Sequence, residues 1–280
     1  MNPPRSRFLD GSPRLHYLEW NPDAREALLL LHGTSANAWW WQPLADASDR
    51  NRFRLLALDQ RGHGDSEWAR PPAYSPDDYA RDLEHFIRTS GLTRPIVAGH
   101  SMGGIAVLCF AARYGELARA AIAIDVAVTS TPRRNRFMSR LKALPLVNYP
   151  DLATAMARFR LMPNEGDIDP AVLSKIAEHS FERVPDGSYS LKFDRATFHG
   201  SDGLDVPSAI ARIGVPTLLV RAERSRIMTA EASVNALASN SRVRLAVIPG
   251  AHHHIPLECP EALAGVVSDF AAGIGGGSGQ

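Results

Sequence analysis

The sequence predicts an α/β fold: a mostly parallel sheet of about eight strands, flanked by helices, with a helical segment inserted between the strand run at 120–124 and the one at 216–220. Three observations predict it. Short, wholly apolar runs alternate with stretches of helical periodicity, as strands covered on both faces and their connecting helices do. This alternation stops over residues 129–205 and then resumes. Near the middle of the chain, an apolar run turns through a glycine-flanked serine directly into a helical stretch.

The runs that predict strands are short and end at polar or glycine-rich turns. They cover residues 15–20, 27–31, 53–58, 95–98, 120–124, 216–220 and 244–248. Helical periodicity predicts helices over residues 75–90, from residue 105 onward, and over residues 260–272. The first of these helices has a start signal, because Ser75 and Pro76 precede two aspartates. This alternation predicts parallel strands joined by helical crossovers.

Residues 129–205 contain no comparable apolar run and instead show amphipathic stretches broken by prolines. They predict helices over residues 136–144, 151–161 and 170–184. Because the strand rhythm brackets this block, we interpret it as an insertion within one domain. The predicted organisation is a core of residues 1–128 and 206–272, a helical cap or lid of residues 129–205, and a flexible glycine-rich tail of residues 273–280.

The composition excludes several classes of function. The 280 residues are 45% hydrophobic with a net charge of +1, which allows a large core and gives no attraction to nucleic acid. No apolar run is long enough to span a membrane, and the first residues lack the apolar region of a secretory signal. Cys109 and Cys259 have no metal-like spacing. We therefore expect a cytoplasmic protein that acts on a small molecule.

Ser101 is the candidate nucleophile. It is the serine of a G-x-S-x-G pattern at residues 99–103, placed between a predicted strand and a predicted helix. A strand that turns straight into a helix crowds the residues beside the turn, and glycine removes the Cβ atoms that would collide. The turn exposes the serine hydroxyl and directs the first free N–H groups of the helix to the same point, where they suit a developing oxyanion.

Four motifs follow one another at the ends of predicted strands. They are His-Gly at residues 32–33, Asp-x-Arg-Gly-x-Gly-x-Ser at 59–66, Gly-His-Ser-Met-Gly-Gly at 99–104, and Gly-Ala-His-His at 250–253 followed by Glu-x-Pro at 258–260. In this order they resemble the α/β-hydrolase family, specifically its smaller cap-bearing members, over about residues 15–272. The resemblance implies a hydrolase with a lid after the sixth strand and no need for a metal or organic cofactor. It disfavours dehalogenase and epoxide hydrolase chemistry, because those relatives have an aspartate where Ser101 stands.

The resemblance also implies a base histidine in the loop after the last strand, where His252, His253 and His254 stand. In the family, the glutamate of Glu-x-Pro lies five residues after the base, and Glu258 lies five residues after His253. His253 is therefore the predicted base. The expected oxyanion hole consists of the backbone N–H groups of Met102, which follows the nucleophile, and of Thr34, in the loop after His32.

The acid of the triad departs from the family pattern. Its usual position, in the loop after the seventh strand, is occupied by Arg226, and a guanidinium cannot accept the imidazole proton. Two carboxylates are candidate replacements. Asp125, at the end of the sixth strand, is favoured because some family members carry their acid there. Glu223, in the usual loop but about one turn too early, is the alternative.

The substrate pocket is expected between core and lid. Its candidate lining residues are Trp39, Trp40, His100, Phe137, Phe159 and His254, which predict an apolar site for an ester or lactone without a charged acyl end. The leading hypothesis is a serine hydrolase that cleaves a small carboxylic ester through an acyl-enzyme. Amide and carbon–carbon bond hydrolysis use the same groups. The alternative outside enzymes is a small-molecule receptor with little or no catalysis. This alternative stays open because Arg226 occupies the usual position of the acid.

Overall fold

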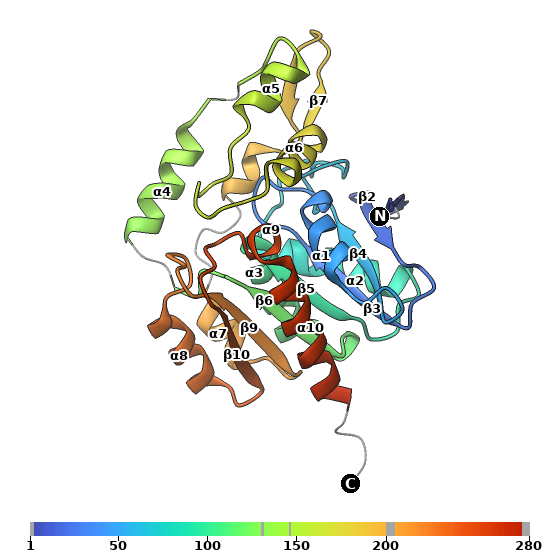
Figure 1. Cartoon of the computed structure of the whole chain (residues 1–280), viewed down its shortest axis with the longest axis vertical. Helices are drawn as coiled ribbons and strands as arrows, with labels where there is room; N and C mark the ends of the chain where they lie inside the picture. Colours follow the sequence, from blue (N-terminus) through green and yellow to red (C-terminus); the bar gives the residue numbers. More distant parts are fainter. Residues whose placement is uncertain (1–2, 130–131, 146, 200–204, 276–280) are drawn as a thin grey trace.

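The computed structural model describes residues 3–129, 132–145, 147–199 and 205–275, and its centre is an eight-stranded sheet (Figure 1). The strand order is β1-β2-β4-β3-β5-β6-β9-β10; the pairs β1–β2 and β2–β4 are antiparallel, and the other pairs are parallel. This arrangement confirms the predicted fold class. The strands are β1 (Arg5–Leu9), β2 (Leu15–Trp20), β3 (Glu26–Leu31), β4 (Phe53–Leu58), β5 (Ile96–His100), β6 (Ala120–Ile124), β9 (Thr217–Ala222) and β10 (Val243–Ile248).

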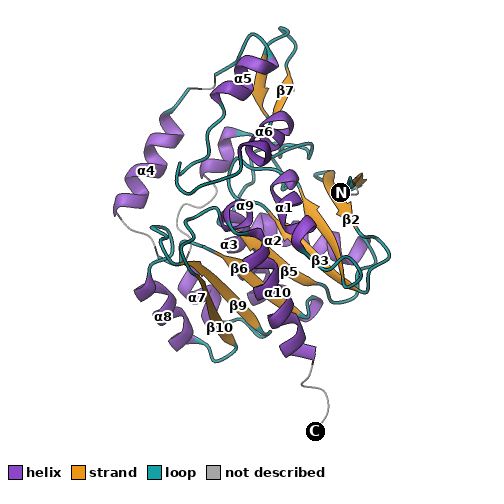
Figure 2. Ribbon diagram, viewed as in Figure 1, coloured by secondary structure: helices purple, strands orange, loops and turns teal. Residues whose placement is uncertain are grey.

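Helices cover both faces of the sheet, which is why the central strands are almost wholly apolar. On one face α2, α3, α7 and α8 pack over side chains such as Leu29, Val97 and Leu219. On the other face α1, α9 and α10 pack over Leu30, Ala98 and Val220. Figure 2 shows the two helical layers around the sheet. The helices are α1 (Gln42–Ala47), α2 (Pro76–Thr89), α3 (Met102–Tyr114), α7 (Val206–Ala211), α8 (Ala230–Ser239), α9 (Ile255–Glu258) and α10 (Pro260–Gly275).

Between β6 and α7 the chain forms a separate layer beyond the carboxyl ends of the strands, at the top of Figure 1. We call its described residues, 132–145 and 147–199, the inserted segment. It contains α4 (Pro132–Ala143), α5 (Leu152–Arg158), α6 (Pro170–His179), the hairpin β7 (Phe181–Arg183) and β8 (Tyr189–Leu191), and a short 3-10 turn over Arg195–His199. A small apolar cluster joins α5 and α6 to Trp40 and Leu257 of the core.

Four sequence expectations need correction. The strand β1 was not predicted, because its exposed, charged residues lack an apolar run. The helix expected over 151–161 is shorter, and the one expected over 170–184 ends at His179. The chain then turns into β7, whose three residues are too few to show a strand period. The last helix continues to Gly275, so residues 273–275 are helical rather than part of a tail, and 276–280 lie outside the described residues.

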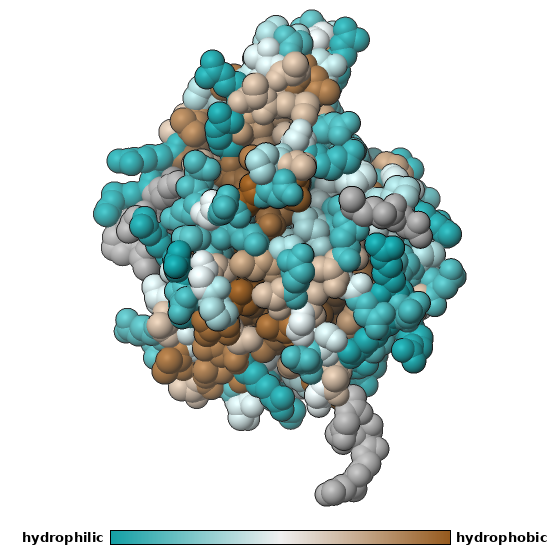
Figure 3. Space-filling view, in the orientation of Figure 1, coloured by the Kyte–Doolittle hydropathy of each residue, from teal (hydrophilic) through white to brown (hydrophobic). Residues whose placement is uncertain are grey.

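One part of the surface is hydrophobic. In Figure 3 hydrophobic residues gather over the lower left, where α8 and the edge strand β10 lie, and these elements expose Val234 and Val247. Within the described residues, no helix is both long enough and apolar enough to cross a membrane.

Candidate active site

Ser101 lies at the turn from β5 into α3, in a backbone conformation that a side chain rarely adopts. Its φ is 53° and its ψ −116°. The turn is tight: a Cβ atom on Gly99 would lie 2.3 Å from the carbonyl oxygen of Gly103, so only glycine fits there. The Ser101 N–H donates to the carbonyl of Ile124 on β6 at 2.9 Å. The neighbouring strand therefore holds this strained turn in place.

Ser101, His253 and Asp125 form one hydrogen-bonded chain. The His253 Nδ1 atom lies 2.7 Å from Asp125 Oδ2, and its Nε2 atom lies 3.1 Å from Ser101 Oγ. Since a carboxylate accepts only, Nδ1 carries the proton and Nε2 offers a lone pair to the serine hydroxyl. Asp125 and His253 are 0% and 4% exposed, so bulk water does not weaken these contacts.

Asp125 is reached by three donors from different parts of the chain. Besides His253, the N–H of Ala222 donates to its Oδ1 at 3.1 Å and the hydroxyl of Ser225 donates to its Oδ2 at 2.6 Å. Ser225 in turn accepts from the N–H groups of Ile227 and Met228. In the family the loop after β9 usually carries the acid itself. In this chain that loop contributes Ser225, which orients the Asp125 carboxylate. Sequence reasoning missed Ser225, which gives no signal without the fold.

The structure places the alternative acid elsewhere. The Glu223 carboxylate accepts the N–H of Gly250 at 2.8 Å, and no hydrogen bond joins it to His253 in the described structure. Arg226 points outward, with its side chain 66% exposed and its guanidinium 3.8 Å from Glu165. At the usual acid position this chain therefore has a surface ion pair.

Glu258 fixes the loop that carries the three histidines. Its two carboxylate oxygens accept the N–H groups of His252 and His254, each at 2.9 Å. The side chain of His252 turns to the same carboxylate at 3.3 Å, while His253 points toward Ser101. Glu258, whose spacing from His253 led to the choice of His253 as the predicted base, therefore also holds the loop around His253 in place.

The two expected oxyanion donors lie on either side of Ser101. Met102 is the first residue of α3, where backbone N–H groups have no partner within the helix. The loop after β3 passes close to the serine, since a Cβ atom on Gly33 would lie 3.3 Å from that of Ser101. Thr34 follows in this loop, and both Thr34 and Met102 line the same cavity as Ser101. His32 supports the loop from below, where its Nε2 accepts the N–H of Gln60.

A cavity of about 350 Å³ opens above Ser101, between the core and the inserted segment. Trp40, His100, Phe159 and His254 line it. Trp39 does not: its ring stacks on His179 of α6 at 3.8 Å, so it packs the inserted segment onto the core instead. Phe137 lies on α4, but its side chain is outside the described residues. Further apolar residues come from both layers, among them Met138, Leu141, Leu161, Phe181, Phe193 and Ile227.

The cavity is lined mainly by apolar side chains, and it also has charged residues that were not expected from sequence. Three arginines contribute to its lining, Arg158, Arg160 and Arg195, and none of its described lining residues is acidic. Arg160 and Arg195 donate to backbone carbonyls, and no ion pair joins either of them to a carboxylate of the described residues. Arg158 has no hydrogen bond or ion pair within the described part of the chain. The cavity is therefore positively charged.

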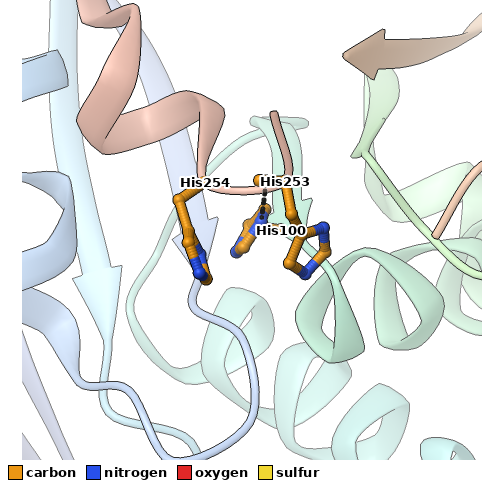
Figure 4. Close-up of side chains that lie close together, drawn as sticks. All are labelled: His100, His253 and His254. Carbon is orange, nitrogen blue, oxygen red and sulfur yellow. Dashed lines mark hydrogen bonds between the residues drawn. The ribbon is translucent and has the colours of Figure 1, made fainter. Parts of the chain in front are cut away.

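Two further histidines, His100 and His254, lie beside His253 (Figure 4). The Nε2 of His100 donates to the carbonyl of His253 at 2.8 Å, and the Nε2 of His254 donates to the carbonyl of Pro163 at 2.8 Å. Burial, reinforced by the neighbouring histidines, holds the pKa of His100 well below its ordinary value, and burial followed by the charge of His253 lowers the pKa of His254 to about 3. Both imidazoles are therefore neutral near pH 7.

In two clusters of the described residues, potential metal-ligating atoms lie within 4.8 Å of one another. One is His100, His253 and His254. The other is His16, Asp59 and Asp65, but there the Asp59 carboxylate already accepts from His16, Ala38 and Asp65. These bonds tie β2 and the loop of residues 59–66 to the chain after β3, which is a structural role.

Comparison with known proteins identifies the family. The model of the alpha/beta hydrolase family matches residues 28–266, so the chain belongs to that family. A curated relative, 2-(acetamidomethylene)succinate hydrolase of Mesorhizobium japonicum, is 30% identical over 87% of both chains. Epoxide hydrolase 3 of Xenopus tropicalis is 27% identical over 94% of this chain and 76% of its own.

A solved structure, that of E-2-(acetamidomethylene)succinate hydrolase, superposes with a TM-score of 0.83 at 28% identity, covering 96% of this chain and 99% of the other. The curated relatives hydrolyse different kinds of bond, so family membership alone does not select among them. The protein is a hydrolase of the α/β-hydrolase family.

Proposed function

We propose that this protein is a serine hydrolase that cleaves a small carboxylic ester through an acyl-enzyme. The observation that carries the proposal is the hydrogen-bonded chain from Ser101 through His253 to Asp125. His253 takes the hydroxyl proton as Ser101 attacks the ester carbonyl, and then gives it to the leaving alcohol. Water deacylates the enzyme by the same route. Asp125 holds the imidazole in the required tautomer and stabilises its charged form.

The backbone N–H groups of Thr34 and Met102 stabilise the oxyanion that forms on the carbonyl oxygen. Residues 129–205 act as the lid over the reacting groups, since the cavity is bounded by the core below and the inserted segment above. Asp125 at His253 supplies the acid that Arg226 cannot, which supports catalysis over a purely receptor role. The serine at the elbow favours acyl transfer over epoxide opening, since epoxide hydrolases have an aspartate there.

We further propose that the preferred substrate carries a carboxylate. The lining arginines give the cavity an excess of positive charge that an acidic substrate would neutralise. The name of the Mesorhizobium relative describes a substituted succinate, which is consistent with this charge. The direct comparison is between p-nitrophenyl hexanoate and the p-nitrophenyl monoester of adipic acid, whose acyl chains are equally long. A higher kcat/KM for the adipate ester supports the proposal, and a higher value for hexanoate contradicts it.

Amide hydrolysis is the second candidate, because the same relative is named for an acetamido compound. The two reactions differ in the leaving group that His253 must protonate. A matched ester and anilide of one acyl group separate them. Ester turnover with a much slower anilide supports the leading proposal, whereas comparable kcat/KM values would favour the amide reaction.

The nucleophile is tested by covalent trapping. A fluorophosphonate should add one phosphonyl group to the wild-type chain, detectable as a single mass increase of the intact protein, because the Ser101 oxygen is activated by His253. Ser101→Ala should show no adduct. An unmodified wild type, or a modified Ser101→Ala, would contradict the proposal.

A further inference from the structure

Three imidazoles converge beside Ser101 with nitrogen atoms free to bind. One ligand atom from each of His100, His253 and His254 lies within 4.8 Å of the other two. The three residues are buried, and they come from the end of β5 and from the loop after β10 (Figure 4). The elbow and the loop held by Glu258 fix the backbone of this cluster. It is therefore a preformed group rather than a chance meeting of surface side chains.

Hydrogen bonding determines which nitrogen atoms are free. The Nε2 atoms of His100 and His254 each face a carbonyl oxygen at 2.8 Å, so they carry the protons. Their Nδ1 atoms then carry lone pairs, and both are buried with no hydrogen-bond partner in the described structure. The Nε2 atom of His253 offers a third lone pair, engaged only by the Ser101 hydroxyl. An unpaired buried acceptor is costly, so this arrangement suits an incoming electron-pair acceptor.

The spacing fits a small cation. Some point lies within about 2.8 Å of all three ligand atoms, because no two are more than 4.8 Å apart, and zinc–imidazole bonds are about 2.0–2.1 Å. Movements of under about 1 Å would complete the coordination. Neutral imidazole is a preferred ligand of Zn²⁺ and Cu²⁺. Ser101 Oγ lies 3.1 Å from His253 Nε2, and the cavity that these residues line gives an ion access.

We propose that His100, His253 and His254, each through one ring nitrogen, form a binding site for Zn²⁺ or a similar first-row divalent ion, and that the bound ion inhibits the hydrolase reversibly. The lone pairs on His100 Nδ1, His254 Nδ1 and His253 Nε2 are the ones available to it. The ion takes the His253 lone pair that would accept the Ser101 proton, so the serine loses its base. It is an inhibitor and no part of the reaction. The inhibition rests on the proposed function, whereas the binding does not.

Calorimetric titration of Zn²⁺ into Ser101→Ala tests binding independently of catalysis. We expect one ion per chain at micromolar affinity or tighter. The same background with His254→Phe, or with His100→Asn, should bind at least about tenfold more weakly, since a lost ligand costs at least as much as a lost supporting contact. His85→Gln, which removes an exposed histidine on α2, should bind Zn²⁺ as Ser101→Ala alone does. Circular dichroism of each variant checks that it is folded.

Two further readouts use the wild-type chain, so they do not depend on any variant folding. Electron paramagnetic resonance of added Cu²⁺ should show coupling to imidazole nitrogens. Ester hydrolysis should fall with added Zn²⁺ and return with a chelator. Absence of Zn²⁺ binding by Ser101→Ala, or equal binding after loss of His100 or His254, would overturn the proposal. An enzyme that binds Zn²⁺ but hydrolyses nothing would instead contradict the proposed function.

Discussion

The carboxyl edge of the sheet and the inserted segment supply different things to the same cavity. At the sheet edge the candidate catalytic residues are held by the backbone: Ser101 and Asp125 both have positive φ values, 53° and 47°, and both are bonded to neighbouring strands. In the inserted segment the polar lining residues Arg158 and Arg160 are exposed and stand at the end of α5. The sheet edge therefore fixes the positions of Ser101 and Asp125, and the inserted segment contributes positive charge to the cavity.

This difference implies a division of roles. Changes at the sheet edge should lower the rate for every substrate, because they move or discharge the reacting groups. Changes in the inserted segment should alter which substrate is preferred, because they change contacts with parts of the molecule that do not react. Each prediction below tests one side of this comparison.

Gly99→Ala should have the largest effect. Its Cβ would meet the Gly103 carbonyl at 2.3 Å, so the elbow must shift. We expect a loss of several kcal/mol of unfolding free energy, at least about 3 kcal/mol, and a fall in kcat of about a hundredfold or more in the folded fraction. Urea unfolding and active-site-titrated kinetics measure the two. Gly214→Ala, where a Cβ meets nothing within 4 Å, is the control, and equal behaviour of the two variants would refute the account of the elbow.

Ser225→Ala should come next. It removes the hydroxyl that donates to Asp125 and should lower kcat for all esters by about tenfold, the value of a hydrogen bond to a charged group. Arg226→Ala, one residue further, is the control because its side chain is mostly exposed. Steady-state kinetics with several acyl groups decide the matter. A fall in kcat for only one of the esters would instead indicate that Ser225 takes part in substrate selection.

Arg158→Gln should change preference rather than rate. We expect kcat/KM for the adipate monoester to fall about threefold to tenfold, since the arginine is exposed and its attraction to a carboxylate is screened. Hexanoate should be unaffected. Arg140→Gln, on α4 and outside the cavity lining, should change neither. An equal fall in kcat/KM for both esters would show that Arg158 does not contribute to substrate selection.

The last prediction concerns stability in acid rather than activity. His63 lies in the loop of residues 59–66 that contacts the inserted segment, and burial, followed by the charge of His32, lowers its pKa to about 3. The unfolded chain keeps the ordinary value, so between about pH 3 and 6.5 it binds more protons, and stability is lost as the pH falls. His63→Phe should weaken this dependence without affecting neutral-pH kinetics. Urea midpoints at about pH 7 and 4.5 measure it, and an unchanged dependence would contradict the assignment.

The sequence predicted the sheet and the family well, because both depend on local patterns. Buried strands must be apolar, so runs such as residues 27–31 stand out. The elbow needs glycine at fixed positions for steric reasons. The spacing of Glu258 from His253 is informative because that carboxylate binds the backbone on both sides of the base.

Other features depend on residues distant in sequence and could not be predicted. Ser225 lies 100 residues from the Asp125 that it contacts. Trp39 and Trp40 are neighbours with the same chemistry, yet one stacks on α6 and the other faces the cavity. The arginines of the cavity, Arg158, Arg160 and Arg195, come from two separate parts of the inserted segment, so no sequence pattern groups them. The hairpin of β7 and β8 is too short for any periodicity to show.

The central claim is that Asp125 is the carboxylate that pairs with His253. The loop after β9, where the acid usually lies in the family, contributes only Ser225, which orients Asp125. Hydrolysis of a short p-nitrophenyl ester by Asp125→Asn and Glu223→Gln, beside the wild type, tests it most directly. We predict that Asp125→Asn lowers kcat by about three to four orders of magnitude, as loss of a triad carboxylate does in serine proteases, and that Glu223→Gln stays within about threefold of the wild type. A collapse of Glu223→Gln with Asp125→Asn still active would contradict the account.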